Sequence, residues 1–249
     1  MISKTITTFP MLKEGILLKR YKRFLADVEL DDGQIVTAHC ANTGPMKGVL
    51  HPGGRVRLRH SPSPSRKLAW SWEQALVSSD DGECWVGVNT SLPNRIVRLA
   101  IEAGFLKNQL GEILTIKNEV TYGVDRKSRI DLLLTPDPSN SDIRQIFLEI
   151  KNTTWKKKST ALFPDTVTTR GQKHLKEMIN ELPASRAVLV PCISRDDIEV
   201  FAPGDSADPT YGELFRHAVD AGVEVIPCAF KFNIDKITWE GVKPFVTHE

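Results

Sequence analysis

The sequence predicts a two-domain protein, with an all-β, OB-fold-like barrel over residues 1–85 and an α/β domain over residues 86–249. Three observations predict this division. Short strand-like segments separated by turns fill the first third of the chain, and helical and strand-like segments alternate after it. The charge changes too: residues 1–76 carry 12 Lys and Arg against 6 Asp and Glu, although the whole chain has a net charge of only +2.

The first third contains about five short strands. The segment GILLKRYKRFLADVEL is followed by the turn DDGQ, the strand IVTAHC and the turn-rich ANTGPMKGVLHPGG. In RVRLRH, Arg55, Arg57 and Arg59 alternate with Val56 and Leu58, which predicts a half-exposed strand with a basic face. Two further strands are expected around SDDGE. This pattern fits an OB-fold barrel but leaves a sandwich open.

The remainder of the chain predicts helices and strands in the order α-β-β-β-α-β-α-β. Helices are expected at 94–104, 169–182 and 209–222, because each has apolar residues at helical spacing or a glycine stop. Strands are expected at 113–124, 129–134, 145–151, 185–193 and 223–232. Such an order is typical of an α/β layer domain.

The composition favours a cytoplasmic protein. The four cysteines are far apart and form no CxxC pair, which argues against a zinc ribbon or a disulfide framework and predicts buried free thiols. The N-terminal segment lacks the features of a signal peptide, and no apolar run approaches 18 residues. We therefore expect no membrane partner. A basic first third fits a module that binds a polyanion, although small β domains often carry a few excess lysines.

Three charged residues lie inside the apolar strands expected at 129–134 and 145–151. Asp131 is within RIDLLL, and Glu149 and Lys151 are within FLEIK. The connecting segment TPDPSNSDIRQ is rich in turn residues, so the two strands are expected to form a hairpin that brings Asp131 opposite Glu149. Glu149 and Lys151 are two residues apart and should therefore point to the same face.

Two converging carboxylates suit a divalent cation. Carboxylate oxygens are hard ligands that prefer Mg²⁺ or Mn²⁺, and a bound cation lowers the pKa of a water molecule that attacks a phosphodiester. Lys151 would position that water or stabilise the anionic transition state. The alternative is an exposed Glu–Lys pair that forms a weak ion pair. The apolar surroundings favour the first interpretation.

The segment after these strands carries further basic residues. Four lysines and Trp155 lie within residues 151–158, which indicates nucleic-acid binding or a solvated loop. Thr169 and Gln172 fit a capping box. Arg170 and Lys173 face phosphate or water, and His174 is expected to be a packed or surface histidine. The residues expected to contact nucleic acid are Arg20, Tyr21, Lys22, Arg23, Arg55, Arg57, Lys156, Arg170 and Lys173.

Several motifs resemble one known family, the sugar fermentation stimulation protein A (SfsA) family. They are RYKRFLADV (20–28), CANTGPM (40–46), VNTSLPNR (88–95), SRIDLLL (128–134), LEIK (148–151) and LFPDTVTTRGQKHL (162–175). They run in order over nearly the whole chain. The chain departs from the family pattern at Asn152, where the family has serine, at Ala41, where it has proline, and at Thr169, where it has glutamate.

The resemblance implies an N-terminal OB-fold and a C-terminal nuclease domain of the PD-(D/E)xK type, similar to restriction endonucleases. It assigns Asp131, Glu149 and Lys151 to the catalytic motif, with Mg²⁺ or Mn²⁺ held by Asp131, Glu149 and the carbonyl of Ile150. Members are described as DNA-binding proteins linked to sugar (maltose) use. Because many nucleases of this fold act as dimers, a homodimer is left open.

Three functions are weighed on this basis. The first is a metal-dependent nuclease acting on DNA, with little sequence specificity because no helix-turn-helix recognition helix is identifiable. The second is a DNA-binding regulator of sugar metabolism that keeps the nuclease scaffold without cleaving. The third is a carbohydrate-binding module, since OB-folds also bind oligosaccharides. The aromatic content of 7% and the basic face argue against the third.

Overall fold

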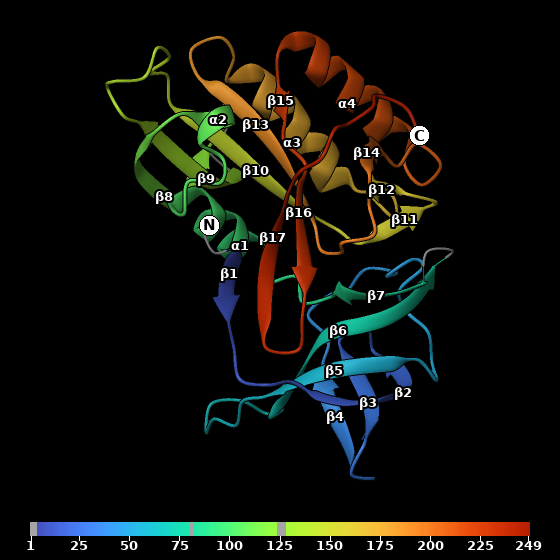
Figure 1. Ribbon diagram of the computed structural model, residues 1–249. Coiled ribbons are helices and arrows are strands. Elements are labelled where there is room, and N and C mark those ends of the chain that lie inside the picture. Colours follow the sequence, from blue (N-terminus) through green and yellow to red (C-terminus); the bar gives the residue numbers. More distant parts are fainter. Residues whose placement is uncertain (1–3, 80–81, 124–127) are drawn as a thin grey trace.

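The computed structural model describes residues 4–79, 82–123 and 128–249 and contains two domains stacked end to end (Figure 1). The turn expected at SDDGE includes Asp80 and Asp81, and the strand expected at 113–124 includes Val124; these three residues lie outside the described ones. The expected fold class is confirmed, with a β-barrel in the N-terminal part and an α/β domain in the C-terminal part. No helix in the described ranges is long and apolar enough to cross a membrane.

The N-terminal domain is a closed barrel of five strands with a sixth strand added. Its strands are β2 (Lys13–Tyr21), β3 (Leu25–Leu30), β4 (Ile35–His39), β5 (Arg55–His60), β6 (Trp70–Ser79) and β7 (Gly82–Gly87). The order β4-β3-β2-β5-β6-β7 is closed by a parallel pairing of β4 with β6. Closure removes the edges that an open sheet would expose and identifies the barrel rather than the sandwich. Gly33, with φ of 82°, forms the DDGQ turn between β3 and β4.

The C-terminal domain is built on a sheet with the order β1-β17-β16-β13-β10-β9-β8, and β15 also pairs with β13. Its strands are β1 (Thr5–Thr8), β8 (Ile113–Tyr122), β9 (Ser128–Pro136), β10 (Ile146–Thr153), β13 (Arg186–Ile193), β15 (Glu224–Val225), β16 (Cys228–Phe232) and β17 (Lys236–Val242). A smaller sheet contains β11 (Trp155–Lys157), β12 (Thr160–Phe163) and β14 (Val200–Pro203). The helices are α1 (Pro93–Glu102), α2 (Lys107–Leu110), α3 (Thr169–Asn180) and α4 (Pro209–Ala221).

The large sheet separates two apolar clusters. One cluster joins the α1 residues Ile96 and Val97 to Leu148 and Ile150 of β10. The other joins Leu175 of α3 to the residues of α4 and β13. Successive side chains of β10 point alternately to the two faces of the sheet. Glu149 therefore points away from the cluster that contains its neighbours Leu148 and Ile150.

The structure adds detail that the sequence pattern did not predict. The strand expected at 223–232 is split into β15 and β16 because Pro227 has no N–H for the ladder. The expected order also lacks β11, β12, β14 and β17, which are short strands or end the chain. The expected domain limit at residue 85 falls inside β7, and β1 pairs with β17 in the C-terminal domain although it precedes the barrel.

The two domains are joined by direct contacts as well as by the chain. The β16–β17 hairpin reaches down to the barrel (Figure 1), where Gln74 Nε2 donates to the Asn233 carbonyl at 2.7 Å. The N–H of Gly87 donates to the Ser194 carbonyl at 2.8 Å. A Cβ at Gly87 would come within 2.3 Å of the Phe232 ring, so only glycine allows this approach. All four cysteines are buried free thiols, as expected.

Candidate active site

The site lies where strands β9 and β10 separate. The pairing runs through Ile146 opposite Leu134, Phe147 opposite Leu133 and Leu148 opposite Leu132. The next pair in this register would be Glu149 opposite Asp131, as the sequence predicted, but the ladder ends one pair earlier. Both carboxylates therefore sit at the open end of the hairpin, where main-chain groups are released from strand pairing.

The Asp131 carboxylate takes the place of the missing strand partner. Its Oδ2 accepts from the main-chain N–H of Ile150 at 2.7 Å, and its Oδ1 accepts from Asn94 Nδ2 on α1 at 2.8 Å. Burial and the nearby charge of Glu149 raise the pKa of Asp131 to about 6, and these two hydrogen bonds oppose the rise. The structure thus holds a carboxylate in a position that disfavours its own charge.

Glu149 is almost completely buried, with 2% of its surface exposed. Its Oε1 accepts from Lys151 Nζ at 2.7 Å and contacts Nδ1 of His174 on α3. Burial alone would raise the pKa of Glu149, but Lys151 and His174 together lower it. The second oxygen, Oε2, is buried without a hydrogen-bond partner in the described residues. Such an orphaned acceptor is costly unless a ligand completes it.

Further polar groups near the carboxylates are incompletely satisfied. Ser128 Oγ donates to Glu177 Oε1 at 2.7 Å, whereas Glu177 Oε2 and the Tyr122 hydroxyl are buried without partners among the described residues. Burial and the charges of Glu149 and Glu177 raise the pKa of Tyr122. Orphaned polar atoms therefore cluster around this end of β9 and β10, as expected of a functional site.

The donor set of the site fits a hard divalent cation. Asp131 and Glu149 supply carboxylate oxygens, and the Ile150 carbonyl faces the same strand edge as the Ile150 N–H that binds Asp131. The described residues contain no group of three or more His, Cys, Asp or Glu arranged around one ion. A cation here would therefore use two carboxylates and a main-chain oxygen, with other ligands from solvent or substrate.

The residues expected to bind nucleic acid on the β2–β3 turn are partly engaged within the protein. Arg20 Nη2 donates to the carbonyls of Asn42 and Gly44, both at 2.9 Å, and Arg23 Nε donates to the Thr43 carbonyl at 2.8 Å. Tyr21 donates to Asp27 at 3.1 Å. Lys22 is exposed, and so is Phe24 next to Arg23. The two arginines thus hold the loop that carries the CANTG motif.

The basic face expected on β5 is neutralised. Arg55 pairs with Glu14 and Asp31, each at 2.6 Å, and Arg57 pairs with Glu14 at 2.8 Å and stacks on the Trp85 ring. The sequence pattern showed the arginines but not the carboxylates that adjacent strands and turns bring to them. Contact of Arg55 or Arg57 with a phosphate would require these ion pairs to break.

The expected residues of the C-terminal domain differ in their availability. Lys156 is largely buried, and its Nζ pairs with Asp197 at 2.6 Å. Arg170 is exposed, and Lys173 is half-exposed with its Nζ 3.4 Å from Glu177. Lys156 is therefore held inside the fold, whereas Arg170 and Lys173 lie on α3 beside the site.

Sequence reasoning missed His174 and Asn94 as site residues. His174 was expected to be packed or exposed, and the structure shows it buried between Glu149, Lys151 and Arg170. The spacing of one turn from Arg170 shows only that the two side chains share a helix face, and it does not show that this face meets Glu149. The capping box expected at Thr169 and Gln172 is not formed. Helix α3 is capped one residue earlier, by Thr168, and Gln172 donates to Asp208 at 3.0 Å.

Comparisons with known proteins match both domains. Residues 18–88 match the family model described as the SfsA N-terminal OB domain, and residues 91–236 match the model of the sugar fermentation stimulation protein RE domain. The chain is 78% identical to a sugar fermentation stimulation protein homolog of Prochlorococcus marinus over 249 residues, covering 100% of this chain and 99% of that protein. It is 67% identical to a homolog from a Synechococcus strain over 244 residues, with 98% of each covered.

A solved structure shares the complete two-domain fold. The structure of Pyrococcus furiosus SfsA in complex with Ca²⁺ matches with a TM-score of 0.83 at 24% sequence identity, and the match covers 97% of this chain and 99% of that one. This likeness extends over the barrel and the α/β domain together.

Proposed function

This chain belongs to the sugar fermentation stimulation protein family, and from that premise we propose that it binds DNA and hydrolyses phosphodiester bonds at Asp131, Glu149 and Lys151 with the help of a divalent cation. One observation carries the proposal. Two carboxylates meet where β9 and β10 separate, and one buried oxygen of Glu149 has no partner in the described residues. Most buried polar atoms in a fold are paired, so this unpaired acceptor between two carboxylate-bearing strands favours a ligand.

The proposed cation is Mg²⁺ or Mn²⁺. Asp131, Glu149 and the Ile150 carbonyl would hold it, and the relative from Pyrococcus furiosus was solved in complex with Ca²⁺, another cation that prefers oxygen ligands. When bound, the cation supplies charge neutralisation and an activated water nucleophile. It would also relieve the repulsion between the two carboxylates that raises the pKa of Asp131.

The protein's own groups have distinct roles in this proposal. Asn94 and the Ile150 N–H orient the Asp131 carboxylate, and Lys151 keeps an ammonium group 2.7 Å from Glu149. That ammonium group positions the attacking water or stabilises the negative charge that develops on the phosphate. This arrangement of an aspartate, followed by Glu-x-Lys on the next strand, is the PD-(D/E)xK pattern.

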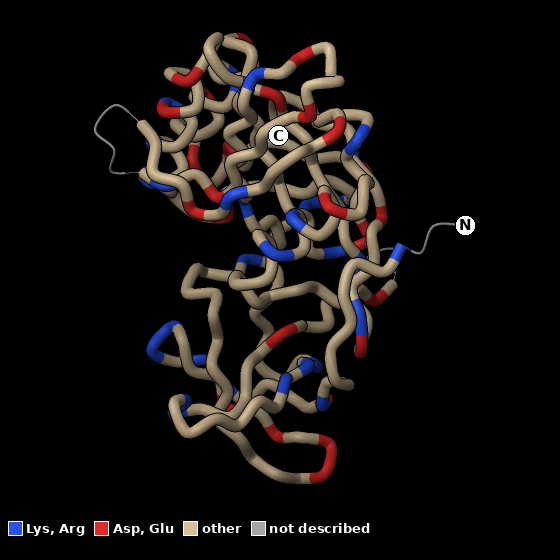
Figure 2. Tube along the Cα trace, turned by 90° about the vertical axis from the view of Figure 1, so that its left-hand side faces the viewer, with Lys and Arg blue, Asp and Glu red and all other residues tan. Residues whose placement is uncertain are grey.

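The proposed DNA surface runs from the barrel to the site. The exposed Lys22 and Phe24 on the β2–β3 turn combine a cation with an aromatic ring, as surfaces that bind DNA strands do. Arg20 and Arg23 bind the loop at 42–44. Figure 2 shows Lys and Arg positions in the barrel and along the boundary between the domains.

The same loop connects this surface to α3. The N–H of Lys47 donates to Asp165 Oδ2 at 3.3 Å, and α3 begins four residues later with Arg170 near its start. A cavity of about 200 Å³ lies at this junction and is lined by Asn42, Asn152 and Trp155 among others. DNA held by Lys22 would therefore continue past Arg170 and Lys173 toward Asp131 and Glu149. We leave Arg55, Arg57 and Lys156 out of this surface because each is paired within the protein.

The proposal is tested by a cleavage assay in which Mg²⁺ or Mn²⁺ is titrated against single-stranded DNA, duplex DNA and RNA. We expect wild-type protein to cleave DNA with little sequence preference and Asp131→Asn to bind it without cleaving. DNA binding without cleavage by the wild type would reject the nuclease and favour the second candidate, a DNA-binding regulator that does not cleave. The absence of DNA binding, with binding of oligosaccharides, would identify a carbohydrate-binding module. Location in the cytoplasm and a homodimer remain predictions.

A further inference from the structure

His174 makes contacts that the motif does not account for. It contacts the buried Glu149 and Lys151 on one side and the exposed Arg170 on the other, and only 4% of its own surface is exposed. We propose that His174 is a positioning residue that fixes the Glu149 carboxylate with Oε2 free for the cation, and that Arg170 holds His174 in the required tautomer. This inference rests on the proposed function, because it assigns a role toward the cation of that site.

The tautomer follows from the neighbours of the two ring nitrogens. Arg170 Nε, which always carries a proton, donates to His174 Nε2 at 3.3 Å, so Nε2 must be the acceptor. A neutral histidine with an unprotonated Nε2 carries its proton on Nδ1. Nδ1 therefore donates to Glu149 Oε1.

The assigned tautomer explains why the two oxygens of Glu149 differ. Lys151 Nζ lies 3.2 Å from His174 Nδ1, and since both atoms are donors this contact is not a hydrogen bond between them. Both donate to the same acceptor, Glu149 Oε1. Two donors occupy Oε1, so the carboxylate cannot rotate without losing both bonds, and Oε2 remains buried and unpartnered. One oxygen is fixed by the protein and the other is left for the ligand.

The helix that carries Arg170 and His174 is itself anchored. Thr168 caps α3 by accepting from the N–H of Gly171, and Asp208 at the start of α4 accepts from the main-chain N–H of Thr168 at 2.8 Å. Residues four apart lie on the same helix face, which places Arg170 above the His174 ring. The rigid support suits a group that must hold a ligand within a fraction of an ångström.

The first test reads the tautomer directly. Long-range proton–nitrogen NMR spectra of ¹⁵N-histidine-labelled full-length protein, with the His174 signal assigned from His174→Asn, should show Nδ1 protonated and Nε2 bare. In Arg170→Met the proton should distribute between the two nitrogens. Arg216→Met is the matched control, since Arg216 lies on α4 and pairs with Asp205 rather than with His174. A signal showing Nε2 protonated in the wild type would overturn the proposal.

The second test measures Ca²⁺ affinity by calorimetry, without DNA. His174→Leu should weaken binding on the order of 10–100-fold, as expected for loss of a residue that orients a ligand. His174→Asn should restore most of the affinity because its amide N–H replaces Nδ1. His217→Leu, at an exposed histidine of α4, is the control. Wild-type affinity in His174→Leu would overturn the proposal.

The outcomes separate this inference from the proposed function. Ca²⁺ binding that depends on His174, in a protein that cleaves no DNA, would support the positioning role and reject the nuclease. If the wild type cleaves DNA and both His174 variants keep the wild-type affinity for Ca²⁺, the nuclease is supported and the positioning role of His174 is rejected. A wild type that binds neither Ca²⁺ nor Mn²⁺ would reject both. If His174→Leu fails to fold, Arg170→Met provides the test, since Arg170 is exposed and a lost tautomer preference should lower Ca²⁺ affinity in the same direction.

Discussion

Two buried ion-pair clusters of the α/β domain show how a structural group differs from a functional one. In one cluster, Asp197 accepts from Arg195 through Nε at 2.6 Å and Nη2 at 2.8 Å, and from Lys156 Nζ at 2.6 Å. Both of its oxygens are satisfied. In the other cluster, Lys151 and His174 both bind one oxygen of Glu149, and the second oxygen has no partner among the described residues.

The pKa values of the carboxylates in and beside the two clusters differ as well. Burial alone would raise the pKa of Asp197, but hydrogen bonds from Arg195 and Lys156 hold it well below its usual range. Asp131, next to the second cluster, has a pKa raised to about 6 by burial and by Glu149. The fold is stabilised by the first arrangement and tolerates the second. Incomplete satisfaction of the Glu149 carboxylate, more than its burial or charge, therefore distinguishes it from Asp197.

The largest expected effect is the loss of cation binding in Glu149→Gln. The change removes the charge that two donors and the proposed cation share, so we expect Ca²⁺ to stop raising the melting temperature and cleavage to fall at least about 1,000-fold, roughly 4 kcal/mol of transition-state stabilisation. Differential scanning fluorimetry and the cleavage assay measure this. Asp197→Asn is the matched control and should retain both properties. Equal loss in the two variants would contradict the comparison.

The second effect is a loss of stability, and it is expected in the structural cluster around Asp197. Asp197→Asn leaves the charges of Arg195 and Lys156 buried with 4% and 8% of their side chains exposed, and should lower the free energy of unfolding by about 3 kcal/mol in urea titrations. The folded-state pKa of Asp197 is depressed, so its contribution is present above the unfolded pKa of about 3.9 and is lost as the pH falls below it. The difference from wild type should therefore narrow below pH 4. A difference that is constant with pH would indicate that the charge of Asp197 is irrelevant.

These two clusters also show what the sequence could predict. Asp131, Glu149 and Lys151 were found because charged residues interrupt two apolar strands, a pattern with a period of two that is visible in sequence. The hairpin register followed from the turn-rich connection. The fold class followed from periodicity and charge, because these reflect which faces are buried.

Partners brought together by tertiary contacts were not predictable in this way. The local sequence of β5 shows only its arginines, which is why it predicts a DNA-binding face. The carboxylates that neutralise Arg55, Glu14 and Asp31, come from β2 and from a turn that are distant in sequence. Lys156 looked like part of a basic loop because Asp197 is 41 residues away. His174 was missed for the same reason, since its contact with Glu149 depends on how α3 packs against β10.

The third effect is a pH-dependent change in stability when Asp131 loses its charge. Because the folded-state pKa is raised, the charged carboxylate destabilises the fold once the pH exceeds the unfolded value near 3.9, and fully so above about 6. Asp131→Asn keeps one of the two acceptor oxygens, and the loss of the other hydrogen bond is independent of pH. The free energy of unfolding of the variant, relative to wild type, should therefore rise by about 2 kcal/mol between pH 4 and pH 8 in EDTA. Urea titrations at the two pH values measure this. A relative stability that falls between pH 4 and pH 8 would show that Asp131 belongs with Asp197 as a structural carboxylate.

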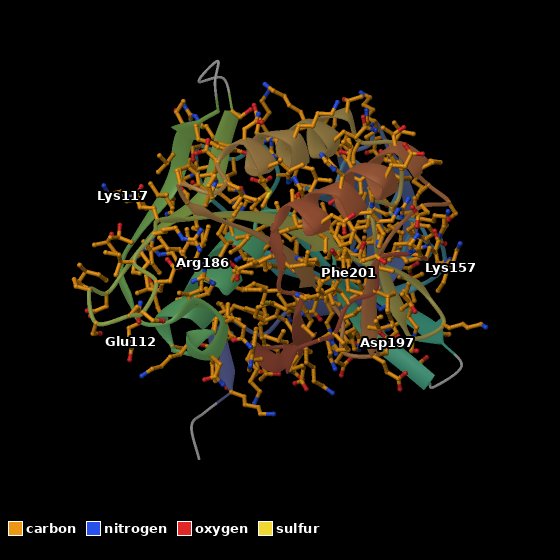
Figure 3. The ribbon with its side chains drawn as sticks, turned by 90° about the horizontal axis from the view of Figure 1, so that it is seen from above. Glu112, Lys117, Lys157, Arg186, Asp197 and Phe201 are labelled. Carbon is orange, nitrogen blue, oxygen red and sulfur yellow. The ribbon has the colours of Figure 1, made fainter. Side chains whose placement is uncertain are left out.

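The smallest effect extends the comparison to the surface, where an exposed lysine of the barrel is set against an exposed lysine of the α/β domain. Lys22→Gln should weaken binding of a DNA oligonucleotide a few-fold and reduce the slope of log affinity against log salt by about one, because one phosphate contact is lost. Lys117→Gln is the comparison, since Lys117 is exposed on β8 at the edge of the large sheet and lies in the other domain from Lys22 (Figure 3). Fluorescence anisotropy at several salt concentrations measures both. If the two substitutions change the slope equally, binding is a diffuse property of the net charge. If Lys22→Gln alone changes it, the β2–β3 turn contacts the DNA backbone, and the path from that turn to Asp131 and Glu149 becomes the surface on which further substitutions should be placed.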